Sequence, residues 1–330
     1  AESSLPMPDF KQSRVVKQWE HSSPLLACRF DPTGKWVFAS AQDSSIQRFD
    51  LATGAKVGFA AHETWVHALA FSPDGEILYS GGYDGRLIFW PAASDAPQPL
   101  RTIEAHPGLS PWIRTVSVSP DGATIATGGN DGIVRLWNAS DGSPVAALTG
   151  HQKNVYSTLF HPEGKLLISG DLAGVVHVWD LAEGKSIGTF DAKELHSYNG
   201  GQGVDYGGVR TLALSADRKY LAAGGLYKAS NPLGAVNEPL ILVFDWETRE
   251  KKQSLVLAGI NGIIWRACFH PEGFLIAGSG GSGGGHIGFW SPEQDKEQHK
   301  LTMPNIVRDL DLHPDGEQIA TSHHDRIVRI

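Results

Sequence analysis

Apolar and polar residues alternate in short runs through most of the chain. The runs WVHALAF (65–71), ILYSGG (77–82) and RLIFW (86–90) follow one another closely, and the more polar PLRTIEAH (99–106) comes next. A side-chain period of two, with β-branched and aromatic residues, is typical of half-buried strands. We see no convincing helical period. The pattern therefore predicts an all-β protein built from groups of four short strands.

One four-residue turn recurs between the first two strands of each group. Proline at its second position presets φ and glycine at its fourth relieves crowding, which together indicate a type I turn. The copies are DPTG (31–34), SPDG (72–75), SPDG (119–122), HPEG (161–164), the degenerate SADR (215–218), HPEG (270–273) and HPDG (313–316). Four short strands in each period of about 40–45 residues are typical of a β-propeller.

Several longer motifs recur in the same order and register. GH before a strand, SPDG, GGNDGIVRLWN (128–138) and GVVHVWDLAEGK (174–185) resemble WD40 repeats, and the resemblance covers about residues 14–330. It implies a seven-bladed β-propeller with four-stranded antiparallel blades. The expected organisation is an N-terminal extension, 1–13, and one propeller domain, 14–330. The regular turns also look like those of bacterial members of the family.

The WD40 family joins a His, a Ser or Thr, an Asp and a Trp within one blade. A buried Asp and His must be paired, which gives this tetrad a physical basis. By the resemblance, two blades carry it in full: His62, Ser80, Asp84 and Trp90 in blade two, and His106, Thr127, Asp131 and Trp137 in blade three.

The other blades depart from this set. Blades five and six largely lack it, so we expect apolar packing to hold them and their tops to be looser. The partial sets are His151, Ser169 and Trp179 in blade four, with Ala173 where Asp belongs, and His21 and Asp43 in blade one, with Phe49 in place of Trp.

The last repeat provides three strands, near 306–312, 317–321 and 326–330. The N-terminal RVVKQWEH (14–21) has the form of the fourth-strand segment PLRTIEAH, including the closing His. We therefore expect residues 14–19 to complete blade seven beside 326–330. This would close the ring and leave no open edge between the first and last blades.

Four insertions fall on one face of the expected propeller, called the top, opposite the recurring turns. They are PGLSP (107–111), residues 191–208, residues 226–239 and GSGGSGGGH (278–286). Insertions are tolerated on loops in general, so drift is one explanation. Their concentration on one face, largely in blades five and six, favours a binding role.

The second residue of each first strand should face the mouth of the central channel. We call these seven positions the mouth ring: Leu26, His67, Arg114, Tyr156, Arg210, Trp265 and Arg308. Arginine suits carboxylate or phosphate, and Trp, Tyr and Arg dominate interface energetics. Neighbouring positions add Trp65, Tyr83, Trp112 and His324. The alternative is that these side chains plug the channel, stack together, or pair with loop carboxylates such as Asp205 and Glu238.

Composition limits the other function classes. The formal net charge is −8, which disfavours a nucleic-acid partner, and no apolar run is long enough for membrane insertion. Cys28 and Cys268 have no metal or redox spacing. The HHD run at 323–325 is the most tempting metal motif, but adjacent strand residues point apart and a metal needs three or four convergent ligands. We expect no cofactor, no metal and no catalytic residue.

Two functional hypotheses follow. The first is a non-enzymatic scaffold that binds a protein or peptide, with an acidic or phosphorylated segment, through the top face and the mouth ring. The second is a small-ligand-binding or metal-dependent hydrolytic propeller that uses the enlarged loops of blades five and six. The first predicts a monomeric propeller inside a larger assembly. The compartment stays open, with the cytoplasm preferred over secretion.

Overall fold

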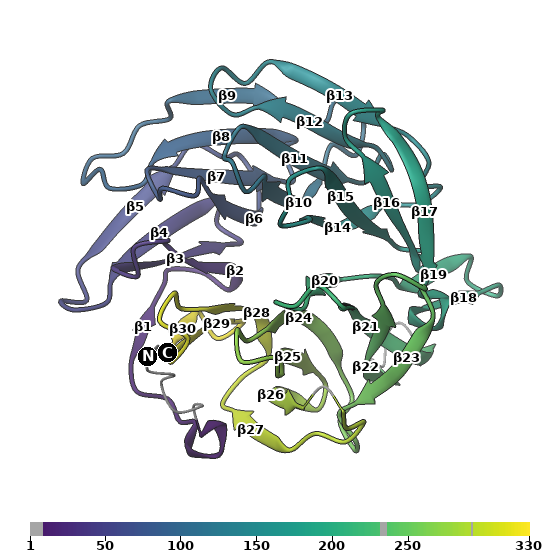
Figure 1. The fold of residues 1–330 in the computed structure, drawn as a ribbon. Coiled ribbons are helices and arrows are strands. Elements are labelled where there is room, and N and C mark those ends of the chain that lie inside the picture. Colours follow the sequence, from purple (N-terminus) through teal and green to yellow (C-terminus); the bar gives the residue numbers. More distant parts are fainter. Residues whose placement is uncertain (1–8, 232–235, 292) are drawn as a thin grey trace, which may run out of the picture.

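The computed structural model describes residues 9–231, 236–291 and 293–330, which form seven four-stranded antiparallel sheets arranged in a closed ring (Figure 1). The prediction of an all-β, seven-bladed propeller is confirmed.

The first four blades follow one another along the chain. Blade one is β2 (Leu25–Phe30), β3 (Trp36–Ala41), β4 (Ser45–Asp50) and β5 (Lys56–Ala60), and blade two is β6 (Val66–Phe71), β7 (Ile77–Gly82), β8 (Arg86–Pro91) and β9 (Arg101–Glu104). Blade three is β10 (Ile113–Val118), β11 (Thr124–Gly129), β12 (Val134–Asn138) and β13 (Pro144–Leu148), and blade four is β14 (Val155–Phe160), β15 (Leu166–Asp171), β16 (Val175–Asp180) and β17 (Lys185–Asp191).

The remaining three blades complete the circle. Blade five is β20 (Thr211–Leu214), β21 (Tyr220–Asn231), β22 (Val236–Asp245) and β23 (Lys251–Val256), and blade six is β24 (Ile263–Phe269), β25 (Leu275–Gly281), β26 (Gly284–Trp290) and β27 (His299–Met303). Blade seven is β28 (Val307–Leu312), β29 (Ile319–His323), β30 (Ile327–Arg329) and β1 (Gln18–Glu20). Two short 3₁₀ helices, η1 (Phe10–Gln12) and η2 (Lys193–Leu195), lie outside the blades. No helix in the described part of the chain is long and apolar enough to cross a membrane.

Burial follows the position of a strand within its blade. The second strands are buried on both faces, as in β7, where five of six residues are buried. The fourth strands alternate, as in β5, where Phe59 points inward between exposed neighbours. Each fourth strand packs against the next blade, and the ring of Phe59 meets that of Trp90 edge-on at 5.6 Å. Truncating such a buried aromatic side chain costs about 3–5 kcal/mol.

The N-terminal strand closes the ring as predicted. In β1, Trp19 lies opposite Val328 of β30, and the ladder continues with hydrogen bonds from Val16 N to Ile330 O (2.7 Å) and from Ile330 N to Lys17 O (2.9 Å). The regular strand is Gln18–Glu20, shorter than the predicted 14–19 and beginning later. The first and last strands of the chain, β1 and β30, thus lie side by side in one blade (Figure 1).

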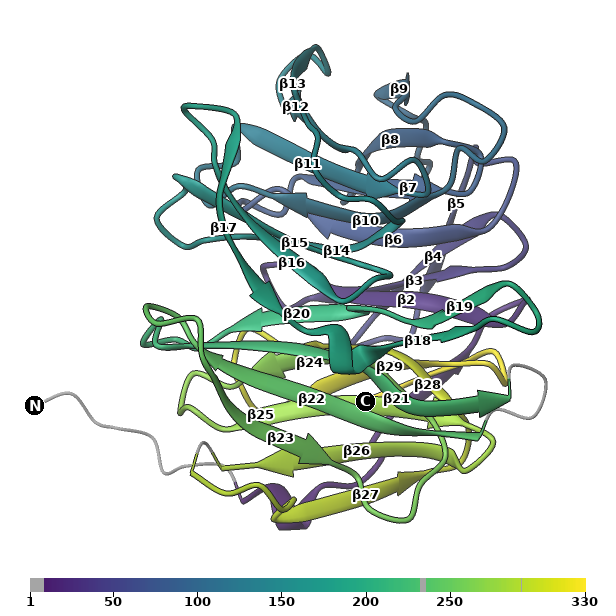
Figure 2. The same ribbon diagram turned by 90° about the vertical axis from the view of Figure 1, so that its right-hand side faces the viewer.

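The insertions of blade five form hairpins. Residues 191–208 contain η2 and a separate two-stranded sheet of β18 (His196–Asn199) and β19 (Val204–Gly207). The insertion 226–239 lengthens the β21–β22 hairpin, and its residues 232–235 lie outside the described residues. Viewed from the edge of the ring, β18–β19 and the far end of β21–β22 project on the same side (Figure 2). That side is the top face.

Candidate binding site at the channel mouth

Blade two contains the complete tetrad. Trp90 Nε1 donates to Ser80 Oγ (2.8 Å), which lies 2.8 Å from His62 Nε2, and His62 Nδ1 lies 3.0 Å from Asp84 Oδ2. Burial would raise the pKa of Asp84, but the hydrogen bond and charge of His62 outweigh it and hold that pKa below its usual value. The Ser–His–Asp order is that of a hydrolytic triad. Here the hydroxyl also accepts from an indole, and Ser80 and His62 are buried.

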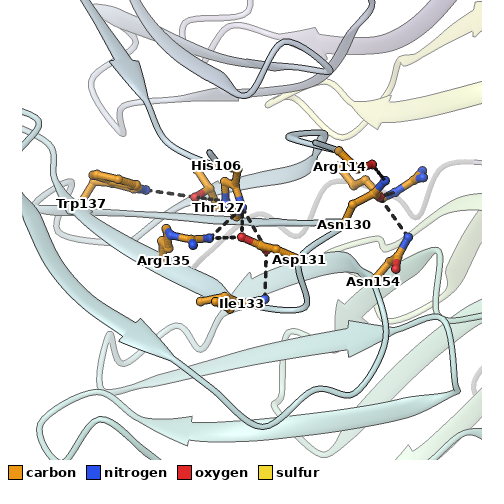
Figure 3. A network of polar contacts seen from close by, with 10 residues as sticks. His106, Arg114, Thr127, Asn130, Asp131, Ile133, Arg135, Trp137 and Asn154 are labelled. Atoms are coloured by element: carbon orange, nitrogen blue, oxygen red, sulfur yellow. Dashed lines mark hydrogen bonds and ion pairs between the residues drawn. The ribbon is translucent and has the colours of Figure 1, made fainter. Parts of the chain in front are cut away.

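Blade three repeats the arrangement with one addition (Figure 3). His106 lies between Thr127 (2.9 Å) and Asp131 (3.1 Å), and Trp137 donates to the threonine hydroxyl (3.0 Å). Arg135 also donates to Asp131. Burial would raise the pKa of Asp131, but these hydrogen bonds prevail and lower it to about 2.

The tetrad fixes two loops of the top face relative to each other. Asp84 follows β7, yet it accepts a hydrogen bond from Glu63 N (2.9 Å) in the loop that precedes β6. The same two loops are joined by Tyr83 N, which donates to Trp65 O (2.9 Å). The buried network thus positions Tyr83 and Trp65 at the channel mouth.

Blade four corrects the sequence analysis. Ala173 does occupy the usual aspartate position, but Asp171, two residues earlier, pairs with His151 Nδ1 (2.9 Å). The equivalent residue in blade two is Gly82, where an added Cβ would lie 2.6 Å from the ring nitrogen of His62. A side chain at this position therefore points at the histidine, and blade four has a full tetrad built in a different way.

The same position is used again in blade seven. His323 takes it, with Nε2 2.8 Å from Thr321 Oγ1, while Asp325 is bound by both terminal nitrogens of Arg329. Burial and the charge of Arg329 lower the pKa of His323 to about 4. His324 is exposed and is not among the residues that line the channel cavity. The run 323–325 therefore splits into three different roles.

The other departures match the sequence analysis. In blade one, Ser22 bridges His21 and Asp43, and Phe49 is fully buried in place of Trp. In blades five and six, Ala223 and Ala277 replace the serine of the tetrad. Each lies two residues after the residue that pairs, on the neighbouring strand, with the aromatic residue at the tetrad position.

The mouth ring surrounds one cavity of about 460 Å³, and all seven of its members line it. Trp65 and Tyr83 also line this cavity. Trp112 joins them by stacking on Tyr83, with ring centroids 4.3 Å apart. Six of the predicted residues lie on first strands and Arg210 directly precedes β20, and all seven line one central space. Whether a partner binds there stays a prediction.

Arginines and aromatic rings alternate around the mouth. The Arg114 guanidinium lies 4.7 Å from the centroid of Tyr156, and that of Arg210 lies 4.0 Å from the same ring. Arg210 also lies 5.6 Å from Trp265, and Arg308 lies 4.8 Å from it. Guanidinium–aromatic contacts of this kind are worth about 0.5–2 kcal/mol. The side chains do stack together, as the alternative interpretation expected.

The two loop carboxylates named in the sequence analysis pair with residues outside the mouth ring. Asp205 binds Lys153 (2.8 Å) and His196 (2.8 Å), and Glu238 accepts from Tyr227 (2.9 Å). Within the described part of the chain, no carboxylate lies within salt-bridge distance of the three mouth-ring arginines, Arg114, Arg210 and Arg308. The mouth therefore holds three uncompensated guanidinium groups in a chain of net charge −8.

A second charged layer lies deeper in the same cavity, and the sequence analysis missed it. Arg29 binds Asp309 (2.6 Å), Arg266 lies 3.9 Å from the same carboxylate, and Asp311 accepts from Phe30 N (2.8 Å). Burial would lower the pKa of Arg29, but the negative charges of the two aspartates outweigh burial and raise that pKa above its usual value. This layer contains two arginines and two aspartates, so its formal charges cancel, and both arginines lie against Asp309. The signal was present, because these residues share the first strands with the mouth ring.

Burial lowers the pKa values of basic groups at the mouth, where no nearby carboxylate among the described residues offsets it. Burial, and then the charge of Arg114, lowers the pKa of Arg210, and burial lowers that of Arg308. Burial and the nearby Arg114 also lower the pKa of His67 to about 4. His67 is therefore neutral near pH 7, and its Nδ1 lies 3.2 Å from the Arg114 carbonyl oxygen. An anion would be stabilised here.

Metal ligation and thiol chemistry find no geometric support. Among the residues that the structure describes, no three His, Cys, Asp or Glu side chains are placed to hold a metal ion. Cys28 and Cys268 are free, and burial raises the pKa of both thiols, to about 12 for Cys268. Raised thiol pKa values disfavour the nucleophilic thiolate.

The family follows from a comparison with family models. The model described as "WD domain, G-beta repeat" matches residues 13–50, 55–91, 97–138, 142–180 and 295–330, more than half of the chain. The chain belongs to the WD40 family. Blades five and most of six lie outside the matched segments, and these are the WD40 blades that lack the tetrad serine.

Individual relatives of this WD40 chain match over short stretches. U3 small nucleolar RNA-associated protein 21 of Saccharomyces cerevisiae is 34% identical over 26% of this chain and 9% of its own length. Serine-threonine kinase receptor-associated protein of Bos taurus is 29% identical over 23% and 22%, and mitotic checkpoint protein bub-3 of Caenorhabditis elegans is 31% identical over 22% and 21%. The chain thus spans less than a quarter of each relative. All three are eukaryotic, which runs against the expected likeness to bacterial members.

Proposed function

We propose that this WD40 propeller is a non-enzymatic scaffold that binds a protein or peptide through its top face and channel mouth. Propellers of this family are protein-interaction scaffolds. The names of two relatives describe association with a kinase receptor and with a small nucleolar RNA. The top face carries the insertions and the aromatic side chains, and the buried tetrads hold its loops in place.

We further propose that the partner contributes an acidic or phosphorylated segment. The observation that carries this step is the contrast between the two charged layers of the cavity. The deep layer contains its own aspartates, whereas Arg114, Arg210 and Arg308 at the mouth have no carboxylate partner among the described residues. Buried or half-buried charges are normally paired, so a partner anion is the natural complement.

A peptide library tests this proposal. Extended peptides with a central phosphoserine, phosphothreonine or glutamate, and matched peptides with serine or glutamine, are screened for binding to the purified propeller. The wild type should retain the anionic peptides, and the triple variant Arg114→Glu, Arg210→Glu, Arg308→Glu should not. Charge-assisted hydrogen bonds contribute about 1.5–3 kcal/mol each, so the loss should exceed about a hundredfold.

A matched variant controls for overall charge. Arg101→Glu, Lys165→Glu, Lys185→Glu makes the same change in net charge at three exposed residues that do not line the cavity. It should bind as the wild type does. Equal loss in both variants would mean that net charge, and not the mouth, controls binding. Equal retention of anionic and neutral peptides by the wild type would refute the acidic preference.

A further inference from the structure

The three arginines of the mouth are not equivalent. Arg114 is held through two of its nitrogen atoms. Its Nε donates to Asn130 Oδ1 (2.6 Å), and Asn154 donates to the same oxygen (3.0 Å) (Figure 3). Its Nη1 donates to Tyr83 Oη (3.3 Å). Its ring contacts include Trp112 at 5.2 Å. Its Nε and Nη1 atoms therefore have partners within the protein.

Arg210 and Arg308 differ in this respect. The Nε atom of each is shielded from solvent and has no hydrogen-bond partner among the described residues. A buried donor without a partner costs about 1–3 kcal/mol. Both guanidiniums contact the indole of Trp265, and the three residues come from neighbouring blades five, six and seven. We call Arg210, Trp265 and Arg308 the charged sector.

The other side of the mouth is aromatic. Tyr83 stacks between Trp65 (6.0 Å) and Trp112 (4.3 Å), and neutral His67 stacks on the same tyrosine (5.3 Å). Trp65 is 42% exposed and Trp112 is 38% exposed. Leu109, in the insertion of blade three, is fully exposed on the same face. We call Trp65, Tyr83 and Trp112 the aromatic sector.

We infer that the mouth binds its partner in one fixed orientation, with an anionic side chain in the charged sector and an apolar or aromatic side chain on the aromatic sector. This inference rests on the proposed function and adds its polarity. The anion, a carboxylate or a phosphoryl group, accepts hydrogen bonds from Arg210 and Arg308, whose Nε atoms have no acceptor among the described residues. Arg114 separates the two sectors and keeps its internal hydrogen bonds.

The anion half is tested without any peptide. Inorganic phosphate is titrated into ¹⁵N-labelled propeller at constant ionic strength, with chloride as the comparison anion, and the arginine Nε–H signals are followed by NMR. Single Arg210→Lys and Arg308→Lys variants assign two of these signals. We expect both to shift saturably with phosphate, while the signals of Arg114 and of the aspartate-paired Arg29 stay in place. An Arg114 shift of equal size, or no shift at Arg210 and Arg308, would overturn the charged sector.

The orientation is tested by double-mutant cycles with a peptide from the library. Replacing its anionic residue should weaken binding to the wild type about tenfold or more, and should change little in Arg210→Gln, Arg308→Gln. Replacing its apolar residue should weaken binding to the wild type and change little in Trp65→Ala, Leu109→Ala. Phosphorylated and glutamate peptides run in parallel decide between phosphoryl and carboxylate groups.

The outcomes separate the two proposals. If peptides bind but the anion couples to Arg114, or each peptide residue couples to the opposite sector, the orientation is wrong and the proposed function stands. If phosphate shifts the two signals but no peptide binds, the charged sector stands as an anion site and the proposed function fails.

Discussion

At the scale of single residues, the position of Asp171 shows how a tetrad tolerates a shifted carboxylate. Its Oδ2 pairs with His151, and its Oδ1 accepts from Val175 N (2.9 Å). Removing one partner of a buried pair leaves the other unsatisfied. We therefore expect Asp171→Ala to lower the free energy of unfolding by about 3 kcal/mol, measured by urea denaturation.

Two variants make this prediction specific. Asp43→Ala removes an exposed carboxylate from blade one and should cost less than about 1 kcal/mol. The double variant Asp171→Gly, Ala173→Asp rebuilds the arrangement of blade two and should recover most of the lost stability. Failure of this double variant to recover would show that blade four needs its carboxylate at 171.

His323 predicts a pH dependence of stability. Its pKa is about 4 in the folded protein, because of burial and Arg329, and about 6.5 when unfolded. Between these values the unfolded state binds a proton that the folded state does not, so stability falls as the pH drops from about 6.5 to about 4. This proton uptake lowers the free energy of unfolding by at most about 3 kcal/mol. His323→Gln should be less stable at pH 7 but lose less on acidification, as urea midpoints at pH 7, 5.5 and 4.5 would show. Equal slopes would contradict the assignment.

Residue-level sequence reasoning succeeded where the repeat fixes the register. The resemblance to WD40 repeats implied the tetrads of blades two and three, and the repeat register predicted the seven mouth-ring positions. The hydrogen-bond partners did not follow: Asp171 replaces a residue that is glycine in blade two, and only the geometry shows that a side chain there faces the histidine. No spacing encodes that Asp205 binds Lys153 and not an arginine of the mouth ring.

At the scale of elements, the strands were predictable and the inserted hairpin was not. Alternation of period two marks the blade strands, but β18–β19 depends on Gly207, whose φ is +91° and where a Cβ would lie 1.9 Å from Leu195 O. Such a close approach admits only glycine. The sequence analysis identified the insertion and its face, while its fold into a separate sheet came from the structure.

The bottom turns of blades six, seven and one form a chain of hydrogen bonds. His270 Nε2 lies 2.9 Å from Gly316 O, and His313 Nε2 lies 2.9 Å from Gly34 O. Each histidine opens a turn and reaches the glycine of the next blade. The three blades joined in this way include the seam where the ring closes, so the turns reinforce the closure made by β1 and β30.

A substitution in this chain should loosen the seam. His313→Ala removes the bond to Gly34 and the edge contact with the ring of Phe30 (4.8 Å). We expect a loss of about 1–2 kcal/mol, with faster amide hydrogen exchange in β1 and β30 than in blade three. His324→Ala, at an exposed residue, should leave both measurements unchanged. Uniform acceleration in all blades would mean that the seam is not a separate weak point.

At the scale of the whole molecule, ring closure and the geometry of the mouth ring are coupled. The mouth ring takes one residue from each blade, so its geometry exists only when blade seven is complete. Arg308 and Asp309 belong to β28 of that blade, and Asp309 pairs across the seam with Arg29 of blade one. Opening the seam would therefore disturb both charged layers of the channel. We therefore expect loss of the closure by β1 and β30 to disrupt the mouth ring as well.

Deleting residues 1–20 tests this coupling directly. The deletion removes the partner of β30 and also Phe10, which stacks on Phe289 of blade six at 5.2 Å. Losing the strand pairing and a packed aromatic ring should lower the free energy of unfolding by more than about 3 kcal/mol. The melting temperature should fall accordingly, and the saturable phosphate response of Arg308 should weaken. Deleting residues 1–8 alone spares these contacts and serves as the control. Identical melting temperatures for the two deletions would refute closure by the N-terminal strand. Exposing the edge of β30 would then not lower the stability of the propeller.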